Sequence, residues 1–534
     1  MHYHMSFMHN YESIPKFFHL LNTFYTRCTV ADINYLTSII HTIINKNLHL
    51  LIPYYQQLLT NRNNIFIRVI IKALIKKYSL LMWNTILILD ECKMNEGGID
   101  VTDCSKEELM EYLVKQHMEN KKQIKGNKKT KNNINIIDNS NSLFTLFLHS
   151  LVKLSKIFMD IAKSKENDLK MNVKFKEVFE IVKNQKITVP GVYNSYKDGP
   201  WIAGFENEIF TFKSLQKPKK ITIIGSDGKK HPFILKWKDD LRKDTRFMDL
   251  NVLVNNLLSN NTNEAQIRIY DVIPFSNCSG IMKFIPHLIS LKSIITEFHS
   301  QEEINSVLVK SMKKKKMERS AFVSACRKFE PVLHRFFTTK CSSPMEFYKF
   351  ITNYTATAAT MSVIGWFMGL GDRHCENFLI DSTTGEVVHV DLNMIFEQGK
   401  KLTIPEKVPF RLTRNVIDGF GSFQLKFFRK IFIEVLEVLR DKKDEILSNL
   451  LSFVYDPIVK GEKCDEILNE SNKLIDSNLI ENVENKKSLN IYGSLAKKLS
   501  DEGIPAEDLT DELIKEATLV ENLRNMYIGW CSFL

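Results

Sequence analysis

The hydrophobic period of this chain changes from helical to strand-like and back, and this change constrains the fold more than any other feature. Residues 1–118 carry apolar residues at three-to-four spacing with few glycines, which predicts a stack of helical hairpins. Residues 119–142 are rich in Lys and Asn and lack a hydrophobic period, so we expect a linker there. Helical patterns resume over 143–185, strand-like patterns occupy about 210–273, and the remainder is mostly helical.

The strand-like segment has the pattern of a small sheet interrupted by a helix. Two apolar runs flank Gly225-Ser-Asp-Gly228, which we interpret as a hairpin turn because it lacks the G-x-G-x-x-G form of a phosphate-binding loop. The expected elements are strands over 220–224, 233–237 and 266–273 and a helix over 239–258. The chain is therefore predicted to be α+β, with a β-rich N-terminal lobe and an α-rich C-terminal lobe.

Composition narrows the class of protein. The 534 residues, 44% hydrophobic and 25% charged, suit two to four globular domains. Nine cysteines without a C-x-x-C pair favour a reducing intracellular compartment, without a disulfide framework or a structural metal. Charges interrupt the apolar stretch 65–89, which is therefore expected to be a buried helix and not a membrane span. Much of the net charge of +11 lies in Lys/Asn tracts, which favours a solvated insert over a DNA-binding patch.

The most informative stretch is Gly369-Leu-Gly-Asp-Arg-His-Cys-Glu-Asn377. An apolar run at 378–380, a turn at 381–386 and a second apolar run at 387–391 follow it. This pattern predicts a helix end, a polar loop and then a hairpin. The hairpin is expected to bring Asn377 and Asp391 together.

This loop has the side chains that phosphoryl transfer requires. Asp372 and Asn377 are five residues apart, the spacing of the H-R-D-x-x-x-x-N loop of protein kinases. We assign Asp372 to orienting a substrate hydroxyl and accepting its proton, and His374 to stabilising the transferring phosphoryl group. Asn377 and Asp391 are expected to hold Mg²⁺, or Mn²⁺, through oxygen atoms. The alternative, a polar loop with a capping Asp and an incidental His, does not account for a match over more than twenty residues.

A lysine for the nucleotide is expected in the β-rich lobe. Lys236 lies in the apolar run 233–237, and a lone strand lysine is more often part of a solvated face. With the catalytic loop downstream, we interpret it as the lysine that contacts the ATP phosphates, with Asp244 as its ion-pair partner.

Several motifs together resemble the phosphatidylinositol-3-kinase-like protein kinases, in which the histidine follows the aspartate of the catalytic loop. The family motifs are Asp239-Asp-Leu-Arg-Lys-Asp244, Gly369-Leu-Gly-Asp-Arg-His374 and Val408-Pro-Phe-Arg-Leu-Thr413. The ATR-type branch is indicated by Ser214-Leu-Gln-Lys-Pro-Lys-Lys220, Asp391-Leu-Asn393 and Met526-Tyr-Ile-Gly-Trp-Cys-Ser-Phe533.

The resemblance implies a domain order and a nucleotide site. It implies FAT-like helical hairpins over 1–118 and 143–185, a bilobal kinase domain over 204–500 and a FATC-like helix and tail over 503–534. It assigns to ATP binding, besides Lys236 and Asp244, a phosphate-loop serine, a deep pocket tyrosine, two hinge residues and two residues beneath adenine: Ser214, Tyr270, Phe284, Ile285, Leu379 and Val390.

Departures from the family pattern are Leu392 in place of the usual Phe, Lys283 in the hinge and Leu534 at the end. None removes a catalytic group. The long upstream solenoid of the family is almost absent, and a reduced form or a fragment beginning at an internal methionine both stay open.

The resemblance implies a serine/threonine protein kinase of nuclear DNA-damage checkpoint signalling that prefers Ser or Thr followed by Gln. It implies protein substrates, an adaptor of the ATR-interacting type, indirect contact with DNA and a dimer through the helical region, without a membrane. A phosphoinositide kinase is one alternative, weakly supported by Lys400, Lys401 and Lys407. A non-catalytic scaffold is the other. The run 313–316 resembles a nuclear address, although a solvated loop is favoured.

Overall fold

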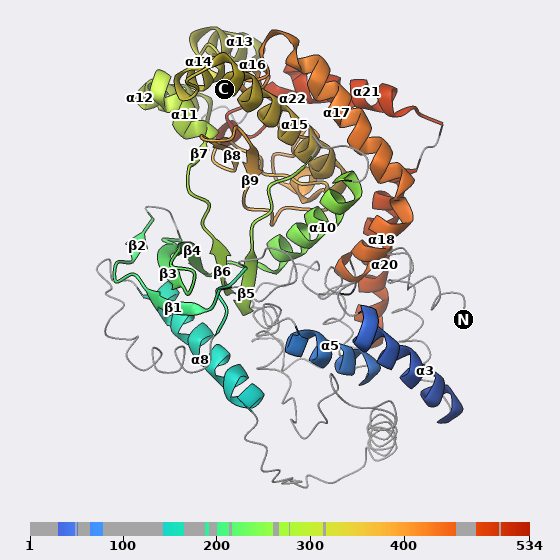
Figure 1. Ribbon diagram of the computed structural model, residues 1–534. Helices are drawn as coiled ribbons and strands as arrows, with labels where there is room; N and C mark the ends of the chain where they lie inside the picture. The colour runs from blue at the N-terminus through green and yellow to red at the C-terminus, as the bar shows by residue number, and fades with distance from the viewer. Residues whose placement is uncertain are drawn as a thin grey trace. The chain divides into compact units, whose positions relative to one another are not determined.

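The computed structural model describes the following residues of the chain: 30–47, 51, 65–77, 143–164, 187–191, 200–212, 216–259, 266–276, 278–312, 317–454, 477–500 and 503–534. They fall into two compact units that are described separately (Figure 1). The first unit comprises Met1–Arg246, Tyr270–Phe284 and Ser448–Leu474, and the second comprises Phe247–Ile269, Ile285–Leu447 and Ile475–Leu534.

The described strands of the first unit form a six-stranded antiparallel sheet. Its order is β1-β3-β4-β6-β5, and β2 pairs with β3. The strands are β1 (Ile202–Phe205), β2 (Phe210–Thr211), β3 (Lys219–Gly225), β4 (Lys230–Trp237), β5 (Val272–Ser276) and β6 (Ser279–Lys283). The two predicted strands around the glycine turn are confirmed as β3 and β4.

The turn between β3 and β4 follows from its glycines. Gly228 has φ +71° and donates its N–H to the Gly225 carbonyl at 3.0 Å. A residue with a side chain rarely adopts that backbone conformation, whereas glycine does so without strain and can close the turn. Along β4, buried and more exposed residues alternate, as expected for a strand with one covered face.

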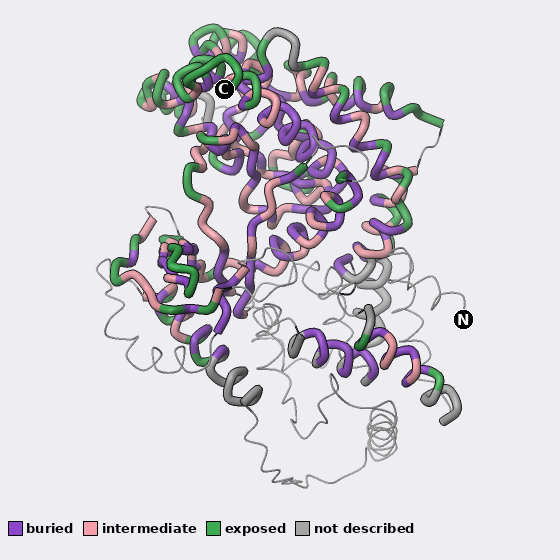
Figure 2. Tube along the Cα trace, in the orientation of Figure 1, coloured by how far each residue is buried: buried purple, intermediate pink, exposed green. Residues whose placement is uncertain are grey.

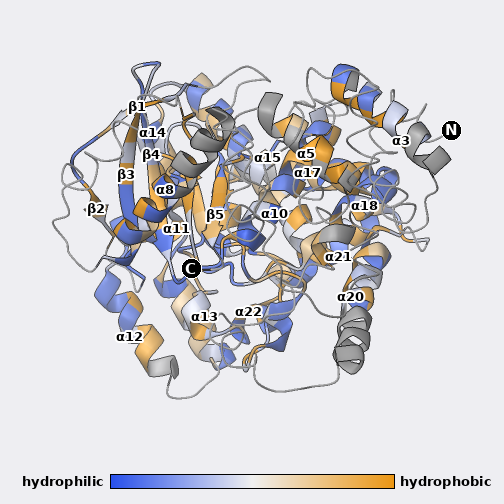
Figure 3. Cartoon of the chain, turned by 90° about the horizontal axis from the view of Figure 1, so that it is seen from below, coloured by the Kyte–Doolittle hydropathy of each residue, from blue (hydrophilic) through white to orange (hydrophobic). Residues whose placement is uncertain are grey.

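Helix α8 (Leu143–Lys163) packs against this sheet, close to the helix predicted from residue 143. Its Phe158 is fully buried and stacks on Phe275 with ring centroids 6.0 Å apart, and it meets Phe205 edge-on at 6.1 Å. In Figure 3, β5 has the orange colour of hydrophobic residues, as its sequence Val-Ile-Pro-Phe-Ser indicates. Aromatic packing therefore joins the last helix before the sheet to the sheet itself.

Two predicted boundaries were wrong. The helix expected from residue 239 is α10 (Arg242–Ser259), because Asp240 accepts the Arg242 N–H at 3.1 Å and ends the irregular segment there. The strand expected from 266 starts at 272. Asn255 of α10 instead binds both the N–H and the carbonyl of Ile267, at 2.9 and 2.8 Å, which removes Ile267 from any strand ladder.

The described residues near the N-terminus are helical, as predicted. They form α3 (Val30–Thr42), the π-helical turn η1 (Ile43–Asn47) and α5 (Ile65–Lys77). The described apolar side chains of α5 are buried, which agrees with a buried helix in this stretch. No helix in the described part of the chain is long and apolar enough to cross a membrane. The predicted linker 119–142, the run 313–316 and Ser214 lie outside the described residues.

The second unit is mostly helical and contains a small sheet. The sheet has the order β7-β8-β9, with β7 (Leu288–Ser290), β8 (Phe378–Asp381) and β9 (Val387–His389). Its helices are α11 (Leu291–Phe298), α12 (Gln301–Met312), α13 (Arg319–Lys328), α14 (Leu333–Lys340), α15 (Pro344–Met368), α16 (Arg414–Asp418), α17 (Gly421–Asp441), α20 (Ser477–Leu499), α21 (Ala506–Thr518) and α22 (Val520–Arg524), with 3-10 turns η4 (Gln398–Lys401) and η6 (Ile528–Trp530). Helix α18 (Lys443–Val454) begins in this unit and ends in the first.

Helix α15 is the core of the second unit. Its sequence sets both ends: Ser343 accepts the Glu346 N–H, Pro344 opens the first turn and Gly369 ends the helix in the left-handed conformation. Most of the helix after Phe350 is buried, seen as a purple stretch in Figure 2. It packs along α17, so the loop that follows Gly369 starts from a fixed point.

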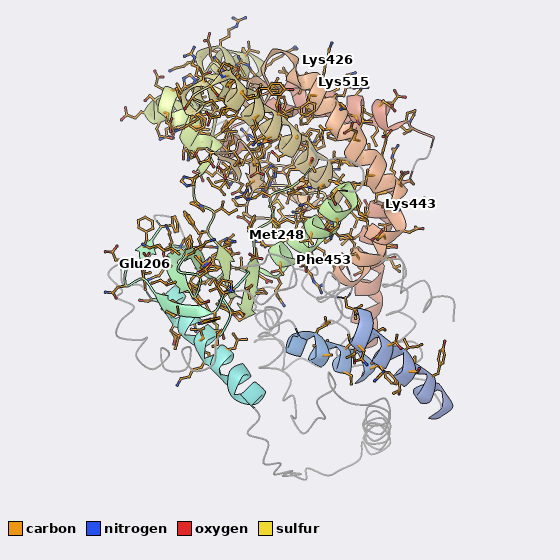
Figure 4. All side chains as sticks on the ribbon, in the orientation of Figure 1. Glu206, Met248, Lys426, Lys443, Phe453 and Lys515 are labelled. Carbon is orange, nitrogen blue, oxygen red and sulfur yellow. The ribbon has the colours of Figure 1, made fainter. Side chains whose placement is uncertain are left out.

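The predicted C-terminal helix is confirmed as α21, which packs against α17 in the second unit. Arg429 of α17 and Asp511 of α21 form a two-pronged ion pair at 2.6 and 2.8 Å. Figure 4 labels Lys426 and Lys515, exposed residues of the same two helices. The exposed ion pair contributes about 0–1 kcal/mol, so buried residues such as Leu513 hold this contact.

Candidate active site

The candidate catalytic loop starts at Gly369, whose φ is +61°. A Cβ on Gly369 would lie 2.5 Å from the Glu397 nitrogen, so only glycine allows this approach. The Glu397 N–H bonds to the Gly369 carbonyl at 3.0 Å, and the Gly371 N–H bonds to the Met394 carbonyl at 2.8 Å. The loop is thus tied by backbone bonds to the segment that follows Asp391.

Asp372 lies in this loop with φ +56°. Its N–H donates to Oε1 of Glu406 at 2.8 Å, and its side chain is 42% exposed. Partial burial raises the pKa of Asp372, an effect that His374 and Arg373 oppose. A partly solvated carboxylate with a raised pKa is suited to accept a proton from a hydroxyl group.

His374 is the neighbour of that carboxylate. Its Nε2 lies 4.0 Å from Oδ2 of Asp372, and its Nδ1 accepts the Glu376 N–H at 3.1 Å. Burial lowers the pKa of His374, although Asp372 and Glu376 oppose this. The neutral ring then carries its proton on Nε2, on the side of Asp372.

Asn377 and Asp391 are brought to the same place by the hairpin, as predicted. The Val390 N–H bonds to the Asn377 carbonyl at 3.3 Å, and Nδ2 of Asn377 donates to the Asp372 carbonyl at 3.0 Å. Arg373, buried to 3% exposure, donates to the Val390 carbonyl at 2.8 Å and to the Asp391 carbonyl. One arginine therefore fixes the loop against the end of the hairpin.

The oxygen atoms of this pair fit Mg²⁺. The bond from Nδ2 orients the Asn377 amide and leaves its Oδ1 for a ligand, and Asp391 uses Oδ1 to accept from Asn393 at 3.2 Å. Mg²⁺ is usually held by one or two protein groups, with water and phosphate completing its shell. Within the described residues, no cluster of three or more His, Cys, Asp and Glu is placed to hold a metal. The assignment of Asn377 and Asp391 as metal ligands stays a prediction.

The hairpin turn is built by Asp381. Its Oδ1 accepts the Thr383 N–H at 2.8 Å and the Thr383 hydroxyl at 2.6 Å, and its carbonyl accepts the Gly385 N–H at 2.8 Å. Gly385 has φ +81°, and a Cβ there would lie 2.4 Å from the Phe350 carbonyl. The turn is thus positioned against α15, the helix that also starts the catalytic loop.

The expected nucleotide residues of the first unit lie on or beside its sheet. Lys236 is on β4 and forms an ion pair with Asp239 at 2.8 Å. Asp244, its predicted partner, is buried in the first turn of α10. Tyr270 is 3% exposed and lies two residues before β5. The ion pair to Asp239 is a contact that sequence reasoning missed, and the pairing with Asp244 stays a prediction.

The expected hinge lies where the chain passes from the first unit to the second. Phe284 is the last residue of its segment in the first unit, and Ile285 begins a segment of the second. Lys220 lies over the Phe284 ring at 4.3 Å. In the second unit, Leu379 of β8 and Val390 after β9 are half-buried. Their roles in adenine binding stay predictions.

A buried arginine, Arg411, was missed as a functional residue. It is 2% exposed and lies 4.4 Å from the centre of the Trp530 ring. Its guanidinium donates to the Arg373 carbonyl at 3.2 Å, the Trp530 carbonyl at 2.9 Å, the Cys531 carbonyl at 3.1 Å and Sγ of Cys375 at 2.9 Å. The only sequence signal was its place in Val-Pro-Phe-Arg-Leu-Thr. This side chain joins the catalytic loop to the C-terminal tail.

Glu406 was also missed as a site residue. Its Oε1 accepts the Asp372 N–H. Its Oε2 lies 2.4 Å and 2.1 Å from the positions that Cβ atoms on Gly371 and Gly399 would take, so both glycines leave room for this carboxylate. Burial raises the pKa of Glu406. It lines a cavity of about 430 Å³ whose other walls are Trp366, Gly369, Leu370, Gly371, Glu397, Gly399, Lys400, Pro405, Lys407, Val408, Pro409, Lys498 and Glu516.

Known families match the two parts of this arrangement. Residues 230–462 match the model described as phosphatidylinositol 3- and 4-kinase, and residues 504–534 match the FATC domain. The catalytic loop, its hairpin and the docked tail therefore define a kinase domain of the phosphatidylinositol 3- and 4-kinase class, which uses ATP, followed by a FATC domain. The chain belongs to the phosphatidylinositol-3-kinase-like protein kinase family, as the motifs predict.

Its relatives include serine/threonine-protein kinases. A probable serine/threonine-protein kinase MEC1 homolog of Encephalitozoon cuniculi is 32% identical over 98% of this chain and 26% of the relative. Serine/threonine-protein kinase ATR of Arabidopsis thaliana is 35% identical over 63% of this chain and 13% of the relative. The open conformation of CtTel1 shares the fold at a TM-score of 0.71 and 22% identity, over 98% of this chain and 20% of that one. The chain thus spans about a quarter or less of these proteins.

Proposed function

We propose that this protein is a serine/threonine protein kinase that transfers the γ-phosphoryl group of ATP to protein substrates. One observation carries this proposal: the loop and hairpin gather four polar residues, Asp372, His374, Asn377 and Asp391. Asn377 and His374 contact Asp372, and Arg373 bonds to the Asp391 carbonyl. Phosphoryl transfer depends on positioning and on charge stabilisation more than on covalent chemistry. A scaffold without activity has no use for such a set of oriented polar groups.

Each of these residues has a chemical role in the proposal. Asp372 orients the substrate hydroxyl and accepts its proton, which its raised pKa favours. The Nε2 proton of His374 is available to a developing charge on the transferring group. Asn377 and Asp391 hold Mg²⁺, or Mn²⁺, which supplies charge neutralisation to the phosphates when bound. Lys236 is the candidate lysine for the α- and β-phosphates, and its neighbour Asp239 orients it.

The segment after Asp391 favours a protein over a phosphoinositide as substrate. Glu397 accepts ion pairs from Lys400 at 3.1 Å and from Lys498 at 2.9 Å, so two of the cations near the cavity are already neutralised. Glu406 adds a carboxylate that reaches the backbone of Asp372. A polyanionic headgroup gains little from such a mixed surface, whereas an amide side chain can bond to it. This supports a preference for Gln after the target Ser or Thr.

A checkpoint role, a nuclear location and an adaptor of the ATR-interacting type are part of the same proposal, with indirect DNA contact. Their support is the similarity to MEC1, ATR and rad3 proteins of several organisms. Dimerisation through the helical region is proposed by analogy with a solved structure described as the complete CtTel1 dimer with C2 symmetry.

A peptide assay tests the proposal. Purified protein with ATP and Mg²⁺ is expected to phosphorylate Ser-Gln or Thr-Gln peptides, and replacing Gln by Ala should lower kcat/KM by about tenfold or more, a little over 1 kcal/mol. Phosphatidylinositol vesicles form the second arm, and the Asp372→Asn protein is the control for contaminating kinases. Equal rates on both peptides would remove the Gln preference. Phosphorylation of lipid alone would make the protein a lipid kinase, and no transfer to either by a folded protein would support a scaffold.

A further inference from the structure

The end of helix α15 is in contact with a lysine from a distant part of the chain. Nζ of Lys498, in the last turn of α20, donates to the Trp366 carbonyl at 2.9 Å and to the Phe367 carbonyl at 3.4 Å. The last carbonyls of a helix have no partner within the helix, and they form the negative end of its dipole. An ammonium group placed there bonds to them and complements their charge. Lys498 therefore caps the helix that starts the catalytic loop.

The same ammonium group holds the segment that follows Asp391. Nζ of Lys498 lies 2.9 Å from Oε1 of Glu397, and the two side chains are 16% and 32% exposed. Burial lowers the pKa of Lys498, and the ion pair with Glu397 opposes this effect. Removing one partner of a largely buried ion pair leaves the other charge uncompensated, so each side chain keeps the other in place.

Glu397 and its neighbour Phe396 have an unusual backbone conformation that these contacts maintain. Their φ values are +58° and +55°, a region that residues with side chains rarely adopt. The Phe396 N–H bonds to the Met368 carbonyl at 2.7 Å, and the Glu397 N–H bonds to the Gly369 carbonyl at 3.0 Å. Such a turn persists only where the surrounding structure holds it. Lys498 contacts both sides of this junction, the helix end and the turn.

Helix α20 gives the lysine a fixed base. The helix packs against α15, and its Leu495 and Leu499 are 3% and 1% exposed. Lys498 lies three positions after the first leucine and next to the second, so its side chain leaves the helix beside this buried face. A positioning group has to be held by packing in this way, because its own displacement would be passed to the groups that it holds.

We propose that Lys498 is a positioning residue for phosphoryl transfer, which holds the end of α15 and the turn at Glu397 together and thereby fixes the catalytic loop against the segment after Asp391. The inference rests on the proposed kinase activity. Lys498 acts through the loop that begins at Gly369 and carries Asp372, and not on a reacting atom. Because phosphoryl transfer depends mainly on positioning and charge stabilisation, a displaced loop should slow the reaction more than it weakens ATP binding.

Steady-state kinetics of the full chain test the proposal. Lys498→Met should lower kcat by about tenfold or more, with the KM for ATP within about twofold of wild type. Lys498→Arg keeps a cation with N–H donors, and the adjoining cavity of about 430 Å³ leaves room for the larger side chain. The arginine variant should therefore recover at least about a third of the wild-type kcat.

An exposed lysine of the same unit supplies the matched control. Lys430 of α17 pairs with Glu434 at 3.5 Å, and its side chain is 61% exposed. Lys430→Met makes the same change of charge and shape without touching α15 or the segment after Asp391. Its kcat should stay within about twofold of wild type, since exposed ion pairs contribute little to stability.

Hydrogen exchange reports the position of the loop independently of catalysis. The amides of Gly371, Phe396 and Glu397 bond the loop and the end of α15 to the segment after Asp391. In Lys498→Met they should exchange at least about fivefold faster than in wild type, because their local opening becomes easier. Lys498→Arg should restore their protection, and peptides from α17 should exchange as in wild type. If Lys498→Met does not fold, Lys498→Gln takes its place in both experiments.

The outcomes separate the positioning role from the proposed function. A folded wild-type protein that transfers no phosphoryl group would overturn the proposed function. With an active wild type, an unchanged kcat in Lys498→Met, or unchanged exchange at Phe396 and Glu397, would refute the positioning role alone. A higher KM with an unchanged kcat would make Lys498 a substrate-binding residue instead.

Discussion

Arg411 stacks on Trp530 and also donates a hydrogen bond to its carbonyl at 2.9 Å, across 119 positions of sequence. The same guanidinium reaches the Arg373 carbonyl at 3.2 Å, in the middle of the catalytic loop. The Lys407 N–H, four residues earlier, bonds to Sδ of Met526 at 3.2 Å. The tail therefore supports the catalytic loop and the segment after Asp391 without offering a reacting group.

Removal of the tail tests this support. A chain that ends before Met526 loses Trp530 and Phe533, which are 4% and 1% exposed, and leaves Arg411 without two of its carbonyl acceptors. Each lost partner of a buried donor costs about 1–3 kcal/mol. We expect kinase activity to fall tenfold or more and the melting temperature to drop. Tyr527→Ala is the matched control, because Tyr527 is 51% exposed. Unchanged turnover by the shortened chain would show that the tail is not a support.

Substitution of the two site carboxylates tests the chemistry. Asp372→Asn or Asp391→Ala is expected to lower kcat by several orders of magnitude, on the order of 4 kcal/mol in barrier, because one removes the proton acceptor and the other a metal ligand. Circular dichroism should show a folded protein in both cases. Near-normal turnover by either variant would refute its assignment.

The raised pKa of Asp372 predicts a pH dependence of stability. A carboxyl group whose pKa is raised by folding stabilises the fold at a pH below its unfolded value, and this contribution is lost as the pH rises through the folded value. Ionised Asp372 is therefore unfavourable at neutral pH. The Asp372→Asn protein should melt at a higher temperature than wild type at pH about 7, with a smaller difference near about 4. The groups that face this carboxylate are Arg373, His374 and Asp391.

The same shift predicts the acid limb of activity. Proton acceptance requires ionised Asp372, so kcat/KM should fall as the pH drops through a value above the ordinary range for aspartate. If the pH profile of the wild-type protein lacks this acid limb, a group other than Asp372 is the base. An acid limb at the value of a free aspartate would contradict the assigned environment.

Glu406 is expected to act by positioning Asp372. Glu406→Gln keeps an oxygen that can accept the Asp372 N–H, whereas Glu406→Ala leaves that donor unpaired. We expect Gln to retain most activity and Ala to lower kcat by roughly tenfold to a hundredfold, with a smaller change in KM. Glu516→Gln, on the same cavity, is the control. A loss expressed only in KM would assign Glu406 to substrate binding instead.

The catalytic loop and hairpin could be predicted because their information is local. A helix ending at glycine, a polar loop and two apolar runs around an Asp-Ser-Thr-Thr-Gly turn determine the meeting of Asn377 with Asp391 within a short stretch of chain. The pairing of Lys236 could not be decided in the same way. Asp239, Asp240 and Asp244 all follow within eight positions, and nothing in this local pattern distinguishes them. The structure pairs Lys236 with Asp239, and its pairing with Asp244 stays a prediction.

The contacts of Arg411 and Glu406 could not be predicted because they are made by the tertiary fold. Arg411 meets Trp530 across 119 positions, and Glu406 meets Asp372 across 34. No hydrophobic period in the sequence indicates which residue either side chain contacts. The start of β5 was missed for a related reason, since a side chain of α10 takes the bonds that a strand would have used.

Asp372 and Asp391 share one further property, a backbone φ of +56°. Few residues other than glycine, asparagine and aspartate adopt this left-handed backbone conformation. For a residue with a side chain, the conformation costs the folded state on the order of 1 kcal/mol or more at each position. Replacing either residue by glycine should relax the backbone and stabilise the folded chain while removing a group that the chemistry needs. At these two positions stability and activity oppose each other, so selection for thermal resistance alone would be expected to yield inactive proteins.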